Sequence, residues 1–151
     1  VTESVDLEGY LHKDSKTNTV KITKHEPRDQ KEFSYIKTGI NPLGQYKVFD
    51  RNKEKVYSEL SIHLYTGKTH QIRAHLASIG HPIVGDFKYG NKDNSLLAKR
   101  CNIKRQLLHA YRVVFPQTEG GFAYLSDKEI VAKPFGDYER ALKELKNGNM
   151  E

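Results

Sequence analysis

Residues 56–65 constrain the fold most, because a mainly aliphatic set of side chains alternates there with a mainly polar or aromatic set, at a period of two. That period is typical of a β-strand with one face in a core. The turn residues 66–69 follow at once, and Ile72, Leu76 and Ile79 then recur at the spacing of one helix face. The sequence therefore predicts a strand, a tight turn and a helix in direct succession.

The predicted helix covers residues 69–79. Thr69 can cap its start by accepting a backbone N–H, and Gly80 can take the left-handed conformation that closes a helix, with Pro82 preventing continuation. A second helix is predicted at the C-terminal end, where Asp137 is a possible cap. Its apolar stripe, expected to pack in a core, consists of Tyr138, Ala141, Leu142 and Leu145.

Short segments rich in β-forming residues, separated by turn residues, make up most of the remaining chain. The predicted strands are residues 10–13, 19–23, 34–38, 45–49, 56–65, 107–115, 122–125 and 129–132. The first two are expected to form a hairpin, and the charged residues 24–32 a surface loop. Gly39, Pro42 and Gly44 are expected to break the chain between the third and the fourth strand. Together these patterns predict one α+β domain, with a mixed, mainly antiparallel sheet and few helices.

The composition favours a polyanionic partner. There are 25 Lys and Arg residues against 19 Asp and Glu, a net charge of +6, so nucleic acid is the first candidate and a plain basic surface is the alternative. The single Cys101 cannot form an intrachain disulfide. No apolar run is long enough for a membrane span and no signal-peptide pattern is present, so we expect a cytoplasmic protein with no membrane contact.

Four basic side chains gather around the predicted start of the first helix: Lys68, His70, Arg73 and His75. The helix dipole places positive charge at that end, which makes additional cations unfavourable there. We therefore expect a compensating anion, either a carboxylate from another part of the fold, a phosphate, or both. A surface helix that is merely basic is the alternative.

A metal site is not expected at these histidines. His70 and His75 are five positions apart, which separates them by about 140° around a helix axis. Gln71 stands where a metalloprotease helix would need its general-base glutamate. Nucleophilic catalysis by Ser or Cys also lacks a motif, because the chain has no Gly-x-Ser-x-Gly element.

Three stretches carry a resemblance to a known family. They are Thr66-Gly67-Lys68-Thr69-His70-Gln71-Ile72-Arg73-Ala74-His75-Leu76, continued by Gly80-His81-Pro82-Ile83-Val84-Gly85-Asp86 and Tyr89-Gly90; Arg105-Gln106-Leu107-Leu108-His109-Ala110; and Gly9-Tyr10-Leu11-His12-Lys13-Asp14. In order and spacing they resemble the ribosomal large-subunit pseudouridine synthases, over nearly the whole chain. The resemblance implies an enzyme that detaches uracil from C1′ of a uridine in RNA, rotates it and rejoins it through C5, using no metal or organic cofactor.

The resemblance also implies that part of the active site is missing. The essential aspartate of the family lies in an Arg-Leu-Asp-x-x-Thr-Ser-Gly motif, and none of the aspartates of this sequence has that setting. The family's active-site tyrosine, on a Lys-x-Tyr strand, would lie before Val1. We therefore expect residues 1–151 to be the C-terminal part of a pseudouridine synthase catalytic domain, inactive without its upstream half.

Several residues of the chain match functional positions of the family. Arg73 matches the arginine that pairs with the catalytic aspartate, where a two-pronged guanidinium lowers the carboxyl pKa and fixes its orientation. Leu108, favoured over Leu107, matches the apolar residue near the target base. The residues expected beside the flipped nucleotide or its phosphates are Lys68, Thr69, His70, Gln71 and His75. Arg100, Lys104 and Arg105 fit either RNA contacts or a solvated basic loop.

Two hypotheses of different classes follow. The chain is part of an enzyme that acts on RNA, with ribosomal RNA as the expected substrate, or it is an RNA-binding module without chemistry of its own. An Arg-Leu-Asp motif encoded upstream favours the first. The target uridine and the oligomeric state are left open by the sequence, because target choice in this family depends on RNA shape and on additional domains.

Overall fold

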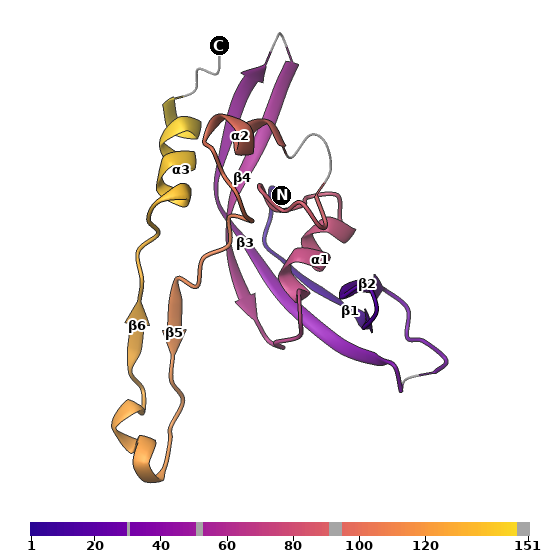
Figure 1. Ribbon diagram of the computed structural model, residues 1–151. Coiled ribbons are helices and arrows are strands. Elements are labelled where there is room, and N and C mark those ends of the chain that lie inside the picture. The colour runs from indigo at the N-terminus through magenta and orange to yellow at the C-terminus, as the bar shows by residue number, and fades with distance from the viewer. Residues whose placement is uncertain (30, 51–52, 91–94, 148–151) are drawn as a thin grey trace.

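The computed structural model describes residues 1–29, 31–50, 53–90 and 95–147. At its centre lies a four-stranded antiparallel sheet with the strand order β2-β1-β3-β4 (Figure 1). In chain order the elements are β1 (Val5–Asp14), β2 (Thr19–Thr23), β3 (Phe33–Asp50), β4 (Lys53–Leu64), α1 (Gln71–Ser78), α2 (Ser95–Arg100), β5 (Arg112–Val114), the 3-10 helix η2 (Gly120–Leu125), β6 (Glu129–Val131) and α3 (Asp137–Asn147). The predicted α+β class, with a mainly antiparallel sheet and few helices, is confirmed.

The predicted hairpin of β1 and β2 is confirmed. The strands pair from Tyr10 with Thr23 to Asp14 with Thr19. One carboxylate oxygen of Asp14 accepts the backbone N–H groups of Lys16 and Thr17 at 2.9 and 3.2 Å. A side chain that satisfies the backbone of the following residues in this way stabilises a turn.

The two strands predicted at residues 34–38 and 45–49 are one long strand, β3, so the predicted break between them is wrong. A register shift between Pro42 and Gly44 absorbs the irregular residues as a β-bulge. The pairing with β1 ends at Ile40, so from Pro42 onward β3 pairs with β4 alone. Proline is tolerated at a bulge or at a strand edge because its missing N–H is not needed there.

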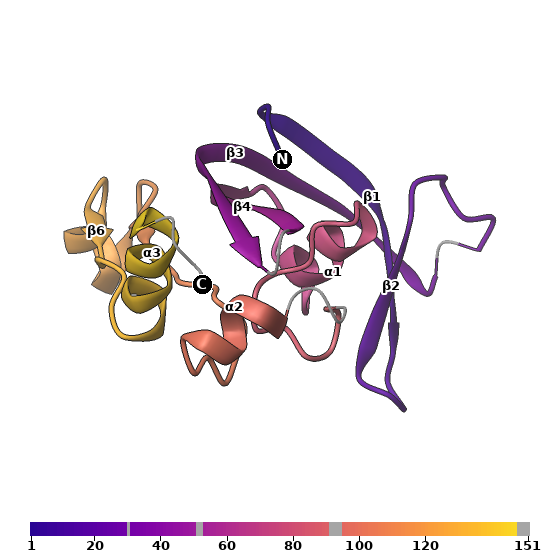
Figure 2. The ribbon, with the colours of Figure 1, turned by 90° about the horizontal axis from the view of Figure 1, so that it is seen from above.

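The helix α1 follows β4 directly, as predicted, and covers one face of the sheet (Figure 2). Its Ala74 packs into a buried cluster with Leu11, Val20 and Ile36 of the sheet. The predicted start was wrong, since the helix begins at Gln71 and Thr69 is not its N-cap. The N-cap position belongs to His70, whose backbone is left-handed (φ 55°) and whose side chain makes no capping bond.

The C-terminal third adds a second core on the β3–β4 end of the sheet. Residues 95–100 form α2, a helix that the sequence analysis did not predict. Leu97 and Ala98 of α2 pack with Val48 of β3 and with Ala141 and Leu145 of α3. The buried side of α3 therefore confirms part of the stripe predicted for the last helix.

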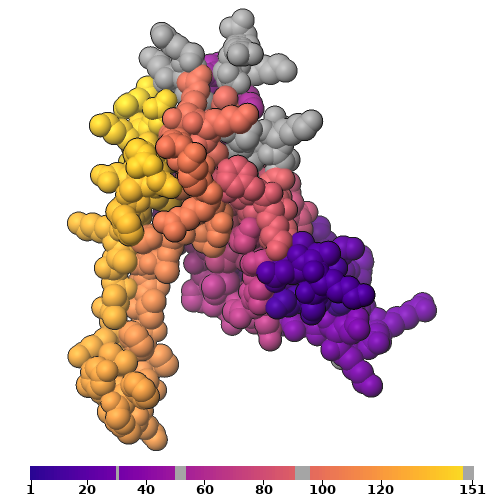
Figure 3. Space-filling model, in the orientation of Figure 1, coloured from indigo at the N-terminus to yellow at the C-terminus, as the bar shows by residue number. Residues whose placement is uncertain are grey.

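An arm made of β5, β6 and η2 projects from this body (Figure 3). The strand predicted at residues 107–115 is reduced to β5, and the one predicted at residues 122–125 is wrong, because those residues lie in η2. Every residue of β5 and β6 is exposed. None of the helices in the described residues has the length and apolar character needed to cross a membrane.

At Gly85 the backbone leaves no room for a side chain. Its φ is +77°, and a Cβ there would lie 2.3 Å from the carbonyl oxygen of Arg105 and 2.8 Å from Ile103 Cγ2. We expect Gly85→Ala to lower the free energy of unfolding by about 2–3 kcal/mol, measured by urea denaturation, because backbone strain and a clash with a main-chain oxygen add together.

The matched control for Gly85 is Gly80→Ala. Gly80 has a similar φ of +80°, but a Cβ added there would meet no heavy atom of the described residues within 4 Å. Only the strain of the left-handed conformation then remains, about 1 kcal/mol. Equal losses of stability for the two variants would contradict the close approach of Gly85 to Arg105.

Candidate functional site

The turn between β4 and α1 is held by the side chain of Gln71, which is buried. Its Oε1 accepts the Thr66 hydroxyl and the Lys68 backbone N–H, both at 3.0 Å. Its Nε2 donates to the carbonyl of Lys37 and to the hydroxyl of Thr38 at 3.0 and 2.9 Å. Two donors and two acceptor positions are thus used inside the protein. Gln71 fixes the turn to β3, and its amide has no capacity left for RNA.

His75 lies on the buried side of α1. Its Nδ1 is 2.9 Å from the hydroxyl of Thr38, which also accepts from Gln71. Burial lowers the pKa of His75, so the ring is held neutral. Gln71 and His75, both expected from the sequence to lie beside the nucleotide, are therefore interior residues that position α1. Neither belongs to the exposed surface of this turn.

The other residues expected around this helix start lie on the outside of the same turn. Lys68 and Thr69 are exposed, and His70 and Arg73 are partly exposed. The structure thus brings together a short basic surface made of Lys68, His70 and Arg73, which we call the helix-start surface.

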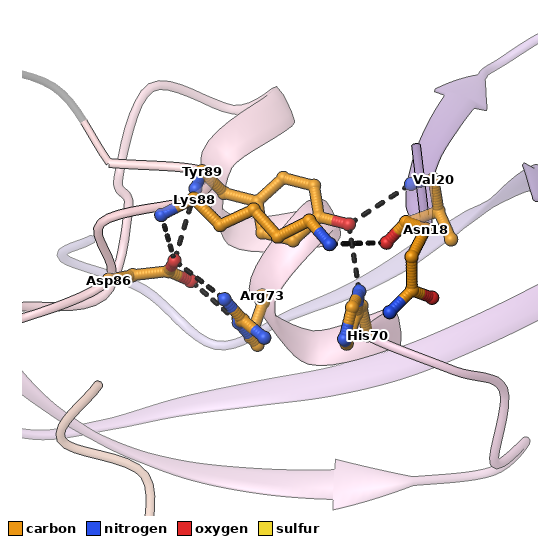
Figure 4. A network of polar contacts seen from close by, with 7 residues as sticks. All are labelled: Asn18, Val20, His70, Arg73, Asp86, Lys88 and Tyr89. Carbon is orange, nitrogen blue, oxygen red and sulfur yellow. Dashed lines mark hydrogen bonds and ion pairs between the residues drawn. The ribbon is translucent and has the colours of Figure 1, made fainter. Parts of the chain in front are cut away.

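Arg73 is bound by a carboxylate of its own chain (Figure 4). Its Nε and Nη2 each donate to one oxygen of Asp86 at 2.8 Å, and the Asp86 side chain is fully buried. Asp86 also accepts the backbone N–H groups of Lys88 and Tyr89, both at 3.0 Å. The Tyr89 ring lies over the guanidinium, 5.1 Å from Cζ to the ring centre. Arg73 is therefore held along one edge and on one face.

The electrostatics of this pair favour the charged forms. Burial of the Asp86 carboxyl raises its pKa, but the bonds from Arg73 and from the two backbone N–H groups outweigh that effect and lower the pKa overall. The hydrogen bonds to Asp86 in turn raise the pKa of Arg73. Asp86 is thus the carboxylate from another part of the fold that the basic helix start requires.

A guanidinium carries five N–H donors, and Asp86 uses one on Nε and one on Nη2. Within the described residues, those are the hydrogen bonds that the Arg73 guanidinium makes. The edge formed by Nη1 and Nη2 therefore keeps donors for a second acceptor, such as another carboxylate or a phosphate. The arrangement can orient one further anion while the charge of Arg73 is already balanced.

Segment 85–90 also contacts the β1–β2 hairpin, at Asn18 of its turn and at Val20 of β2. The Tyr89 hydroxyl accepts the backbone N–H of Val20 at 3.0 Å and lies 2.9 Å from Nδ1 of His70. Lys88 Nζ donates to the carbonyl of Asn18. These contacts join the hairpin, the 85–90 segment and the helix start into one network (Figure 4).

Asp86 and Tyr89 were not among the candidate site residues from the sequence. Both occur in the Gly85-Asp86 and Tyr89-Gly90 elements that carry the family resemblance, yet those elements assign them no partner. The one usable signal was the need for an anion beside Arg73. That need indicates a carboxylate but does not identify it, because any aspartate of the chain could pair with Arg73 as long as the fold is unknown.

Leu107 and Leu108 occupy different surroundings. The Leu107 backbone N–H donates to the Val84 carbonyl at 2.8 Å, and its side chain packs against both the α2–α3 core and the core beneath α1. Leu108 is 43% exposed. Both line a groove of about 670 Å³ that also contains Ile72 and Tyr138. Arg73 and Asp86 are not among the residues that line this groove, although Ile72, next to Arg73 on α1, is. The side chains of three basic residues that precede Leu107 in the sequence are exposed: Arg100, Lys104 and Arg105.

Comparison with known proteins identifies the family. The sequence profile described as RNA pseudouridylate synthase matches residues 3–78, half of the chain. The chain belongs to the RNA pseudouridylate synthase family. The predicted resemblance is therefore confirmed, and the matched region includes β1 to β4 and α1 with Arg73.

Individual relatives agree with the family profile. An uncharacterised RNA pseudouridine synthase of Aquifex aeolicus is 37% identical over 115 residues, covering 72% of this chain and 35% of the relative. Another of Mycobacterium bovis is 35% identical over 140 residues, 93% of this chain and 42% of the relative. Ribosomal large subunit pseudouridine synthase D of Xylella fastidiosa is 38% identical over 96 residues, 59% of this chain and 28% of the relative. The chain thus spans less than half the length of these relatives.

A solved structure supports the fold. Human RNA Pseudouridylate Synthase Domain Containing 1 superimposes with a TM-score of 0.57 at 21% identity, over 97% of this chain and 61% of that chain. At this identity the likeness concerns the fold alone.

Proposed function

We propose that this chain forms part of the active site of an RNA pseudouridine synthase, an isomerase that converts uridine to pseudouridine in RNA, with ribosomal RNA as substrate. Family membership supports the reaction class, and the name of the Xylella fastidiosa relative supports the ribosomal target. The observation that carries the proposal is the guanidinium of Arg73, fixed by Asp86 and Tyr89 with part of its donor edge unoccupied.

In this proposal residues 1–151 are the C-terminal part of a catalytic domain, and the nucleophilic aspartate comes from a segment outside them. The remaining N–H groups of Arg73 orient that aspartate and stabilise its charged form. Lys68, Thr69 and His70 contact the flipped nucleotide or its phosphates, and Leu108 packs near the target base. As the family resemblance implies, the proposed reaction uses no metal or organic cofactor.

We expect the chain by itself to form no pseudouridine, because none of its carboxylates stands in the Arg-Leu-Asp motif. The measurement is pseudouridine mapping of ribosomal RNA after incubation with the chain alone, and with a protein that joins it to a segment carrying the motif. Product from the joined protein only is the expected result. Robust product from the chain alone would show that the active site has been placed wrongly.

The second candidate function is RNA binding without chemistry. It is favoured by the exposed Lys68 and the partly exposed Arg73 of the helix-start surface, combined with the absent motif. A joined protein that binds RNA but forms no pseudouridine would support this candidate over the first.

RNA binding by the chain should be largely electrostatic, so it should weaken steeply with salt. With about three phosphate contacts, the slope of log K against log salt for a single strand is about −2, or roughly a 15-fold loss of affinity between 50 and 200 mM salt. Fluorescence anisotropy with a labelled uridine-rich oligonucleotide measures it. Affinity that does not change with salt would contradict the expected phosphate contacts.

A further inference from the structure

His70 occupies a backbone conformation that few residues adopt. Its φ of 55° and ψ of 16° are left-handed, although it is not a glycine. Such a conformation costs free energy and persists only where surrounding contacts hold it. Its side chain makes no capping bond to α1. The imidazole contacts Tyr89 instead, edge to face, with the ring centres 5.6 Å apart (Figure 4).

The contact with the Tyr89 hydroxyl bears on which ring nitrogen of His70 carries the proton. A phenol has one proton to donate and can accept hydrogen bonds as well. The backbone N–H of Val20 can only donate, so the hydroxyl accepts from it. The hydroxyl proton is then available for Nδ1 of His70, 2.9 Å away. In this assignment each group has a partner, Nδ1 is an acceptor, and the ring proton lies on Nε2.

The charges around His70 favour the same state. Burial lowers its pKa, the cations Arg73, Lys88 and Lys13 lower it further, and Asp86 opposes them. The ring is therefore neutral near pH 7. Within the described residues, the hydrogen bonds of His70 include no partner for Nε2. A fixed N–H donor is thus left on the helix-start surface beside Arg73 and Lys68.

We propose that His70 contacts RNA as a neutral hydrogen-bond donor through Nε2, and that Tyr89 is the positioning residue that holds the imidazole in this tautomer. The ligand chemistry is an oxygen acceptor of RNA, either a base carbonyl or a phosphate oxygen. This inference rests on the proposed RNA function. Because Tyr89 also binds the backbone of Val20, it makes the donor geometry depend on where the β1–β2 hairpin lies.

The tautomer can be tested on the chain without RNA. Nitrogen NMR of ¹⁵N-histidine-labelled protein near pH 7 should show His70 with a bare Nδ1 and a protonated Nε2. Tyr89→Phe keeps the ring over Arg73 but removes the hydroxyl, so the preference for one tautomer should decline. The exposed His25 serves as an internal reference in the same spectra. A protonated Nδ1, or an unchanged tautomer in Tyr89→Phe, would overturn the role of Tyr89.

The RNA contact can be tested with His70→Asn. Asparagine tolerates the left-handed backbone, and its shorter amide side chain does not extend to the position of Nε2. We expect a loss of affinity for a uridine oligonucleotide of roughly three- to tenfold, the value of one hydrogen bond. His25→Asn, the matched control in the exposed 24–29 region, should bind like the parent chain. An abasic oligonucleotide of equal length separates the two acceptors: the effect of His70→Asn persists on it if the acceptor is a phosphate and disappears if it is a base carbonyl.

The outcomes separate this inference from the proposed function. If His70→Asn binds RNA like the parent chain while Lys68→Ala weakens binding, the His70 contact is overturned and the RNA function stands. If the parent chain binds neither oligonucleotide, the RNA function and the His70 contact both fail. Weakening by His70→Asn together with the Nε2–H tautomer supports the inference in full.

Discussion

Arg73→Ala should slow pseudouridine formation by roughly a hundredfold or more in a protein that joins this chain to the motif aspartate. The reason lies in the geometry of the pair: Asp86 fixes the guanidinium along Nε and Nη2, so the remaining N–H groups point in one fixed direction. Without them the aspartate loses orientation and its pKa rises. RNA affinity should change far less, because Lys68 and the other surface cations remain. Single-turnover kinetics at saturating RNA measure the chemical step.

Two further variants separate charge from orientation. Arg73→Lys keeps the charge but cannot bind two carboxylates with a planar fork, so it should restore only part of the rate. Arg112→Ala removes another two-pronged pair, with Glu129 on the exposed arm, and should leave the rate unchanged. A normal single-turnover rate for Arg73→Ala would make Arg73 an ordinary phosphate-contacting or structural residue.

Local sequence patterns predicted those elements whose cause is local. The period of two in residues 56–65 predicted β4, and the turn residues between the first two strands predicted the β1–β2 hairpin, because both signals arise within a few residues. The break predicted within β3 failed for the opposite reason. A proline such as Pro42 interrupts a strand only where an adjacent strand needs its backbone N–H as a donor. Here the β-bulge and the end of the pairing with β1 remove that need.

The start of α1 shows how tertiary contacts override a local cap. Thr69 is a good capping residue, but Gln71 already satisfies the backbone N–H of Lys68 and ties the turn to β3. The left-handed His70 is then stabilised by its contact with Tyr89, nineteen positions later. Neither contact is visible in a helix pattern. For the same reason the sequence could assign Gln71 and His75 to a surface only by resemblance, and the structure places both inside.

The sequence predicted that an anion is needed at the start of α1, but it did not predict that Asp86 is the carboxylate that binds Arg73. A basic helix start needs an anion, and the sequence analysis expected either a carboxylate or a phosphate there. The choice of Asp86 depends on the left-handed Gly85, which lets segment 85–90 turn back over α1. The fold thus supplies one anion itself and leaves the other donors of Arg73 for a second.

Asp86→Ala should be the most destabilising single change in this region. It removes a fully buried carboxylate that accepts four hydrogen bonds, two from Arg73 and two from the backbone of Lys88 and Tyr89. Breaking a buried pair leaves the other charge without its partner, at a cost of about 3–4 kcal/mol here, because Arg73 is still partly exposed and keeps some solvation. For a chain of this size that is roughly a 6–16 °C fall in Tm, measured by calorimetry.

Variants and pH test whether the loss comes from the ion pair. Asp86→Asn keeps the shape and an acceptor oxygen but not the charge, so its loss should be smaller, whereas Glu129→Ala on the exposed arm should leave Tm unchanged. Folding lowers the pKa of Asp86. The stability that this carboxylate contributes to the parent protein is therefore fully present above its unfolded pKa, about 4, and is lost as the pH falls through its folded pKa. Asp86→Ala should therefore flatten the acid limb of the stability curve. An Asp86→Ala protein that melted like the parent at pH 7 would mean that the hairpin and α1 hold Arg73 without Asp86.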